Sequence, residues 1–269
     1  MYQLRKITIV VLLVSSAFIS CRKNDSPSNQ EKPMSLLRKI EWNVGLVSQY
    51  EYNSDSTIRQ IASLQGTISS LNTYTHINKR VTEVNTGHSL YTNKFYYTGD
   101  LLTSIINASI HPTLPDSYKL EYEYDNKKRL SRLLYYDIHE GGQTLKASST
   151  YLYNAEGLPS KITTQSGSAV INTYVDAYSA QHRFNPWVFV AIGLNENYTL
   201  YNYPVLRNAQ RLPAIIRTTR INPGQPEVLE KTVTNTYFIN NLRLDSVKSS
   251  VVFDTEPQYN ASFSYKLLY

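Results

Sequence analysis

The strongest constraint on the fold is a strict two-residue alternation that starts at Tyr118. Charged residues occupy every second position, and between them lie the aromatic or apolar residues Tyr118, Leu120, Tyr122 and Tyr124. Because successive side chains of a strand point to opposite faces, this pattern predicts a half-buried β-strand. The polar segment 125–128 favours a turn, and a second apolar run covers residues 130–136. Residues 118–137 are therefore predicted to form a β-hairpin.

Weaker copies of this hairpin recur along the chain. Each copy has a strand that ends in an aromatic pair, then a short polar turn, then two apolar residues three positions apart. The aromatic pairs begin at Tyr50, Phe95, Tyr122, Tyr151, Tyr201 and Tyr237, and the apolar residues begin at Ile58, Leu102, Leu130, Pro159, Pro213 and Leu244. Residues 263–265 repeat the first strand without a partner. A lone hairpin is marginal in water, so the copies must pair or stack, which predicts an all-β antiparallel meander or stacked-hairpin array.

Composition agrees with a folded β-protein and excludes some functions. The chain has 23 Tyr against 7 Phe and 2 Trp, and tyrosine suits a strand face that is apolar along the ring and wet at the hydroxyl. The formal charge of +6 includes Arg5 and Lys6, so it falls to +4 when residues 1–20 are removed. This charge is too diffuse to predict nucleic-acid binding.

The N-terminus carries a targeting signal. Arg5 and Lys6 precede an apolar run, residues 7–14, that is too short to span a bilayer. The run ends in Ala-Phe-Ile-Ser-Cys, which resembles a bacterial lipobox and implies that Cys21 is acylated. We therefore predict a lipoprotein signal peptide over residues 1–20 and, because residues 21–34 are polar and contain Pro and Ser, a flexible tether.

Cys21 is the only cysteine in the chain, so the mature protein can form no internal disulfide. Residues 35–269 are predicted to form the β-domain.

The repeated unit resembles a known family. Tyr-x-Tyr-Asp, a turn and Leu-x-x-Ile are similar to the YD repeat of Rhs-type proteins in a short, degenerate form, over residues 36–269. Together with the lipobox, the unit resembles YD-repeat-like envelope lipoproteins of Bacteroidetes-type bacteria. The resemblance implies an open, twisted sheet and a cell-envelope location, and it implies no activity.

One segment, residues 174–198, breaks the repeat and is predicted to be an insertion that caps or crosses the sheet. It contains Trp187 and two Phe residues, so it could be a hydrophobic plug that completes the core. Alternatively it is a loop that contacts a ligand through His182, Asn185 and Trp187, because binding residues are often found on loops.

The residues of familiar catalytic and metal sites do not form their usual patterns. The five histidines lack metal-ligand spacing, and there is no nucleophile elbow or phosphate-binding glycine loop. Glu121 and Glu123 lie about 7 Å apart on one strand face, which a solvated polar face explains better than glycoside hydrolysis. We therefore expect no metal, no cofactor and no catalytic residue.

A second architecture remains open. The alternating tail Phe263, Tyr265, Leu267 and Tyr269 is similar to the last strand of an outer-membrane β-barrel. The lipobox, Pro159 and Pro213 near strand starts, and the charges Arg129 and Arg132 argue against it.

The sequence thus predicts a monomeric, lipid-anchored outer-membrane protein that binds a glycan, peptide or protein partner, with exposed tyrosine rows as the contact surface. The alternatives are an envelope hydrolase with a site near residues 174–198 and a small outer-membrane barrel.

Overall fold

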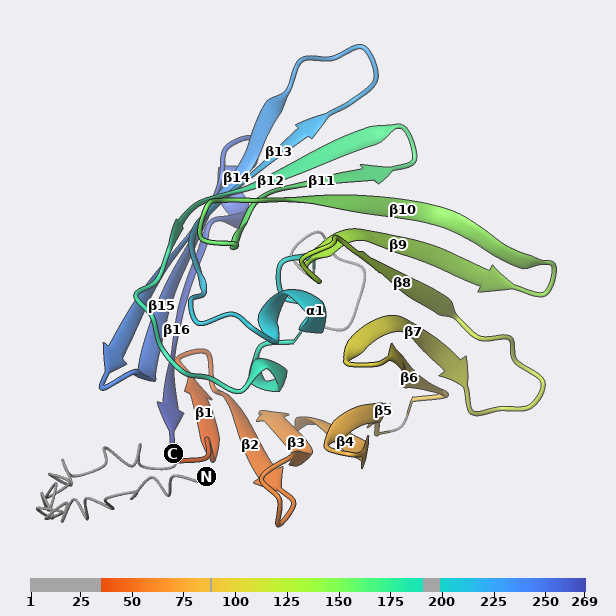
Figure 1. The fold of residues 1–269 in the computed structure, drawn as a ribbon. Coiled ribbons are helices and arrows are strands. Elements are labelled where there is room, and N and C mark those ends of the chain that lie inside the picture. Colours follow the sequence, from red (N-terminus) through yellow and green to blue (C-terminus); the bar gives the residue numbers. More distant parts are fainter. Residues whose placement is uncertain (1–34, 88, 191–198) are drawn as a thin grey trace, which may run out of the picture. The chain divides into compact units, whose positions relative to one another are not determined.

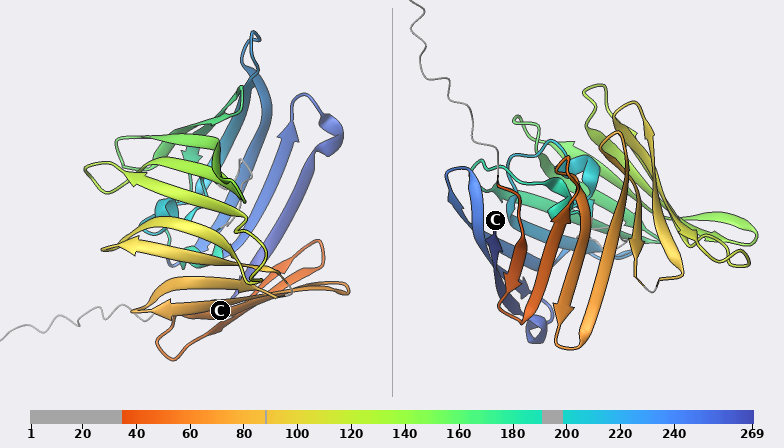
Figure 2. Two further views of the ribbon diagram at one scale, coloured as in Figure 1. Left: turned by 90° about the vertical axis from the view of Figure 1, so that its right-hand side faces the viewer. Right: turned by 90° about the horizontal axis from the view of Figure 1, so that it is seen from below.

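The computed structural model describes residues 35–87, 89–190 and 199–269, and Ser35–Tyr269 forms one compact unit. Within these residues, sixteen strands follow one another around a closed antiparallel barrel (Figures 1 and 2). The strands are β1 (Lys39–Trp42), β2 (Leu46–Tyr52), β3 (Ile58–Gln65), β4 (Ile68–Ile77), β5 (Arg80–Thr86), β6 (Tyr91–Thr98), β7 (Leu101–Ser109), β8 (Tyr118–Tyr124), β9 (Leu130–His139), β10 (Gly142–Tyr153), β11 (Pro159–Ser166), β12 (Ala169–Tyr178), β13 (Pro213–Ile221), β14 (Val228–Asn240), β15 (Arg243–Phe253) and β16 (Ala261–Leu268).

The described helical elements are short: η1 (Pro186–Val188), α1 (Tyr203–Leu206) and η3 (Pro257–Tyr259). None of the helices in the described residues is long and apolar enough to cross a membrane. The predicted signal peptide (residues 1–20), tether (residues 21–34) and acylated Cys21 lie outside the described residues.

The hairpin predicted over residues 118–137 is confirmed as β8 and β9. Asp125 forms its turn, since one carboxylate oxygen accepts from the main-chain N–H groups of Lys127 and Arg129, each at 2.9 Å. Lys128 completes the turn at a φ of 60°. The β4–β5 hairpin, by contrast, was not predicted, because only the first aromatic of the pair, Tyr74, is present and His76 stands in place of the second.

The prediction of all-β structure is confirmed, but the prediction of an open sheet is wrong. The terminal strand β16 has a partner, β1, and their register pairs Trp42 with Tyr265 and Lys39 with Leu268. Strand β1 has only four residues, which is too short for an alternation signal, yet it supplies the last set of backbone partners. Closure removes the sheet edges that an open array of YD-like hairpins would have to protect.

The predicted copy from Tyr201 to Pro213 is also wrong. Strand β13 pairs with β12, and Pro213 lies opposite Tyr178. Tyr203 instead begins α1. Residues 179–212 connect these two strands. Their described part, residues 179–190 and 199–212, enters the ring of strands (Figure 1), and we call it the plug. The non-sheet segment therefore begins at Ser179, whereas residues 174–178 belong to β12.

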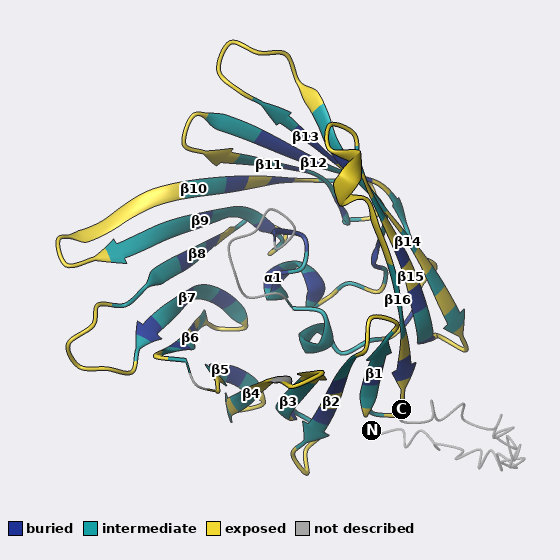
Figure 3. Ribbon diagram, turned by 180° about the vertical axis from the view of Figure 1, so that it is seen from behind, coloured by how far each residue is buried: buried dark blue, intermediate teal, exposed yellow. Residues whose placement is uncertain are grey.

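The apolar core lies between the plug and one half of the barrel's inner face. Plug residues Leu200, Leu206 and Leu212 are at most 2 % exposed, and they belong to two clusters that include residues of the barrel wall. The wall residues Leu102 and Leu130 are at most 1 % exposed. They lie just after turns that join an even-numbered strand to the next odd-numbered strand, such as the β6–β7 and β8–β9 turns. We call the barrel end with these turns the plugged end. The strands become more exposed towards the opposite end (Figure 3), as in residues 142–146 of β10.

Most core tyrosines point inward, which corrects the expectation of exposed tyrosine rows. Tyr50, Tyr122 and Tyr151 are each 6 % exposed. Six further tyrosines lie at the plugged end, at the ends of β6, β8, β10, β12 and β16 and within β14. The hydroxyl of each donates to the main-chain carbonyl of a residue that begins, or nearly begins, the preceding strand. The donor–acceptor pairs are Tyr97–Val81, Tyr124–Leu102, Tyr153–Leu130, Tyr178–Pro159, Tyr237–Pro213 and Tyr269–Leu244, at 2.5–2.9 Å. We call these six residues the tyrosine ring, and they explain why the repeat retains tyrosine rather than phenylalanine.

Candidate functional site

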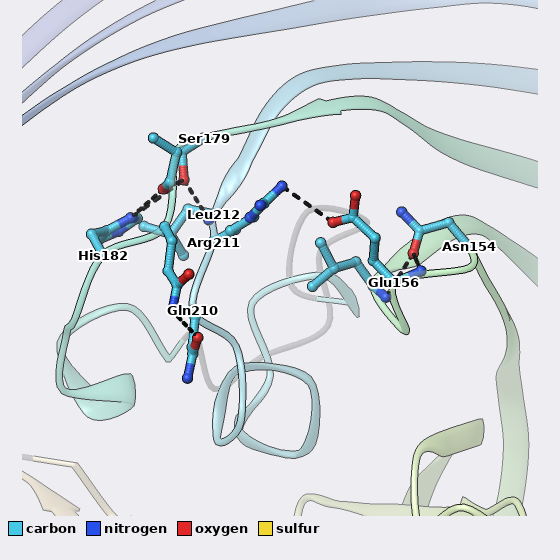
Figure 4. Close-up of polar contacts among 10 residues, drawn as sticks. Asn154, Glu156, Ser179, His182, Gln210, Arg211 and Leu212 are labelled. Carbon is cyan, nitrogen blue, oxygen red and sulfur yellow. Dashed lines mark hydrogen bonds and ion pairs between the residues drawn. The ribbon is translucent and has the colours of Figure 1, made fainter. Parts of the chain in front are cut away.

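The two ends of the plug are joined to each other where they leave the sheet (Figure 4). Ser179 donates its main-chain N–H to the carbonyl of Leu212 at 2.9 Å, and its hydroxyl accepts from the N–H of Leu212 at 3.0 Å. His182 N–H donates to the carbonyl of Gln210 at 2.8 Å. These bonds extend the β12–β13 pairing and fix the direction in which the plug enters the barrel.

His182, a predicted ligand contact, is 0 % exposed. Its Nδ1 lies 3.0 Å from the carbonyl of Ala180, and its Nε2 has no hydrogen-bond partner among the described residues. The ring lies against Phe184 and Tyr237, with centroid distances of 5.3 and 6.0 Å. Burial lowers the pKa of His182, only partly offset by the Ala180 carbonyl, so the neutral form with the proton on Nδ1 is favoured.

Asn185 and Trp187, the other two predicted contacts, also have packing roles. The Asn185 side chain accepts from Trp187 N–H at 3.0 Å and thereby caps η1. The Trp187 ring stacks on Tyr203 at 4.5 Å and meets the edge of Phe95 at 5.5 Å. Hence, within the described residues, these three side chains join the plug to itself and to the wall, and their role as ligand contacts stays a prediction.

A buried hydrogen-bond network also holds the plug against β10. The Tyr151 hydroxyl donates to the carbonyl of Thr199 at 2.9 Å and lies 3.1 Å from the amide nitrogen of Asn202. Asn202 in turn accepts from Val205 N–H at 3.1 Å and caps α1. The network fixes the start of α1, and with it the residues that follow.

Those residues form one side of a pocket of about 280 Å³ at the plugged end, which we call the rim pocket. The other side comes from the β8–β9 and β10–β11 turns and the starts of β11 and β13. Apolar side chains, among them Leu158, Leu200 and Val205, make much of the wall. The cations of the pocket are Lys127, Lys128, Arg129, Arg207 and Arg211, and no Asp or Glu belongs to its described lining.

Two of the five cations have carboxylate partners outside the lining. Arg129 pairs with Asp125 at 2.7 Å, and Arg211 pairs with Glu156 at 3.2 Å (Figure 4). The pKa of Asp125 is lowered by hydrogen bonds from Arg129, first of all from its main-chain N–H, so the carboxylate stays ionised.

The remaining three pocket cations have no carboxylate partner in the described part of the chain. Arg207 donates to the main-chain carbonyl of Asp100 at 2.7 Å, and it also lies over the ring of Tyr124. Lys127 and Lys128 are exposed on the β8–β9 turn. The rim pocket thus combines an apolar wall with uncompensated positive charge.

Sequence reasoning missed the rim pocket because its cations are far apart in the chain. Lys127, Lys128 and Arg129 are an evident basic run in a predicted turn, but Arg207 and Arg211 join them only because the plug folds back into the barrel. The basic run itself was the one available signal. Among the described residues there is also no cluster of three His, Cys, Asp or Glu side chains that could hold a metal.

The outer face of the barrel is rich in polar and charged residues. Following strand register from β8 to β13, one continuous row consists of Glu123, Arg132, Thr150, Thr163, Asn172 and Thr219. These positions alternate with inward residues such as Tyr122, Tyr151 and Ile162, so they face outward. Glu121, considered as a catalytic carboxylate, also faces outward and pairs with Lys119 at 2.5 Å.

A second polar network covers the outer face near β12 and β13. Glu227 accepts hydrogen bonds from Asn172, Tyr174 and Thr219, and these bonds, first of all that from Thr219, lower its pKa. An ionised carboxylate is therefore held against the outer wall.

Comparisons with known proteins bear on the fold. Neither a protein-family model nor a curated protein sequence matches the chain. A solved porin-like protein from Bacteroides uniformis is similar with a TM-score of 0.53 and 11 % identity, covering 86 % of this chain and 96 % of that one. A porin-like protein from Bacteroides vulgatus gives 0.49 and 12 %, covering 87 % and 99 %. The first likeness agrees with the closed barrel and, like it, contradicts the open YD-repeat sheet that the resemblance implied.

Proposed function

We propose that this chain is an outer-membrane-associated binding protein. Its barrel is surrounded by water rather than inserted in the bilayer, and an N-terminal lipid on Cys21 anchors it to the membrane. The observation that carries the proposal is the distribution of polarity across the barrel wall. The inner face at the plugged end is apolar and packed by the plug, while the outer face carries the polar row and ion pairs described above.

Charged side chains on the outer wall oppose contact with lipid hydrocarbon. Transmembrane barrels have an apolar outer band about 25 Å tall, and an Arg or Lys on the lipid face costs about 2–4 kcal/mol at the bilayer midplane. Two outward cations lie opposite the same residue of β12, Tyr174: Lys161 and Arg217. Lys161 flanks the core residue Ile162, and Arg217 pairs with Asp176 at 2.5 Å. Such a surface is stabilised by water and opposes insertion.

The second candidate function is an outer-membrane pore, which the fold likeness to a porin-like protein favours. The plug opposes it, because plug residues and the inner wall share the same two apolar clusters. An envelope hydrolase with a site in the plug would need accessible polar groups there, and His182 is fully buried.

Planar-bilayer conductance separates the first two candidates. The full-length protein, purified in detergent and added to a bilayer, is expected to give no stepwise conductance, whereas a pore gives discrete steps. As a matched measurement, protease digestion of intact cells and of cells with an opened outer membrane determines which side the barrel occupies, with Cys21→Ala as the unanchored control. Stable conductance steps would refute the proposed function.

A further inference from the structure

We infer that the rim pocket binds a phosphate-bearing amphiphile, with the anionic head on the pocket cations and the chain on the apolar wall. This inference rests on the proposed function as a binding protein and names the ligand class. Its basis is the meeting of three separate elements, the β8–β9 turn, the β10–β11 turn and the plug, around a single pocket of about 280 Å³.

The charge of the pocket selects an anion. Arg207 donates to a neutral carbonyl and lies over an aromatic ring, and Lys127 and Lys128 project from the turn. None of the three has a carboxylate partner in the residues described. Ammonium and guanidinium groups both donate to phosphate oxygens, and such charge-assisted bonds are stronger than neutral ones. A cationic or neutral head would leave this positive charge uncompensated.

The wall of the pocket selects a ligand with an apolar part. Leu130 and Pro159 belong to the barrel, and Leu158, Leu200, Pro204 and Val205 add further apolar surface. Pockets that bind small molecules are mostly apolar with a few polar groups that fix orientation. Free phosphate would use the cations but leave the wall in contact with water.

The position of the pocket agrees with a ligand from a membrane. Even-numbered strands end at the plugged end, and β16 is one of them. Because Lys39 of β1 pairs with Leu268 at the end of β16, strand β1 starts at the plugged end. The chain that leads back to Cys21 therefore enters the barrel at the end that holds the rim pocket. Cys21, the predicted lipid site, precedes Lys39 by 18 positions in the sequence (39 − 21), so a short stretch of chain connects it to this end.

Calorimetric titration of the full chain carrying Cys21→Ala tests the inference with three probes. Decyl phosphate, used below its critical micelle concentration, has both the anionic head and the alkyl chain. Inorganic phosphate has only the anionic group, and decyl maltoside has the same alkyl chain with an uncharged head. We expect decyl phosphate to bind at least about tenfold more tightly than either other probe, because only it satisfies both parts of the pocket.

Variants identify the site. Lys127→Gln combined with Lys128→Gln is expected to weaken decyl phosphate about tenfold. The matched control is Lys79→Gln, because Lys79 is also an exposed turn lysine of the plugged end with positive φ, 63° against 60° for Lys128, but it does not line the pocket. Equal losses in both variants would overturn the assignment.

The remaining outcomes also decide. Equal affinity for inorganic and decyl phosphate would make this a free-phosphate site and overturn the amphiphile. Equal affinity for decyl phosphate and decyl maltoside, or no binding, would overturn the anion site. The conductance measurement tests the proposed function independently of these titrations. Conductance together with selective binding of decyl phosphate would refute only the proposed function, and no conductance together with no such binding would refute only the ligand assignment.

Discussion

Removing one hydroxyl of the tyrosine ring tests how the barrel is held closed at the plugged end. In Tyr124→Phe the ring stays, but the hydroxyl that donates to the carbonyl of Leu102 at 2.6 Å is lost. Leu102 is 0 % exposed, so water cannot readily replace the lost donor. A hydrogen bond is worth about 0.5–1.5 kcal/mol, and an unsatisfied buried group costs about 1–3 kcal/mol, so we expect a loss of about 1.5 kcal/mol.

Thermal unfolding followed by circular dichroism measures this loss. For a chain of this size, each kcal/mol lowers the Tm by about 2–4 °C, which predicts a fall of about 3–6 °C for Tyr124→Phe. The matched control is Tyr96→Phe, because Tyr96 is 46 % exposed on the outer face, and its Tm should change little. Adding Tyr97→Phe and Tyr153→Phe should roughly triple the loss, since these positions lie on separate strands and share no partner. An unchanged Tm in the triple variant would refute the role of the tyrosine ring.

Three further predictions concern the core and pH. Leu206→Ala in α1, where Leu206 is 1 % exposed, should cost about 2–5 kcal/mol in denaturant unfolding, and an unchanged midpoint would show that the plug does not complete the core. Burial lowers the pKa of His182 below its usual 6.5, so stability that is present above pH 6.5 should be lost as pH falls. His182→Phe should reduce this acid sensitivity, and an equal dependence of unfolding stability on pH in both proteins would contradict the prediction. Burial raises the pKa of Tyr74 and of Tyr118 to about 12, so stability that is fully present below pH 10 should fall as pH rises towards 12. Tyrosine ionisation and unfolding should then occur in one transition, and ionisation well before unfolding would contradict the prediction.

The hairpins with a clear alternation could be predicted from sequence because the signal is local. Strands β8 and β9 lie where residues 118–137 predicted them, including the Asp125 turn. Closure depends on a pairing between distant segments, Lys39–Trp42 with β16. The alternating tail in β16 favoured the barrel alternative, but no local pattern identifies β1 as its partner. The same holds for the plug, since Tyr201 and Tyr203 imitate a strand end but begin a short helix inside the barrel.

The candidate site was harder to predict than the fold. His182, Asn185 and Trp187 were chosen because they are distinctive residues in a non-repeating segment, and such residues also serve to pack a plug. The rim pocket depends on Arg207 approaching the β8–β9 turn, which only the three-dimensional path of the plug determines.

The most direct test of a barrel that stands in water is thiol labelling of its outer wall in isolated outer membranes. Thr150→Cys and Lys248→Cys place single thiols on the outward, exposed faces of β10 and β15, while Ser149→Cys places one on the buried inward face of β10. The parent protein, whose only cysteine is Cys21, gives the background. A charged, membrane-impermeant maleimide should label both outward thiols as fast as Lys79→Cys in the exposed β4–β5 turn and leave Ser149→Cys protected. Protection of Thr150→Cys and Lys248→Cys, with labelling of the turn alone, would show that lipid covers the wall and would contradict the account.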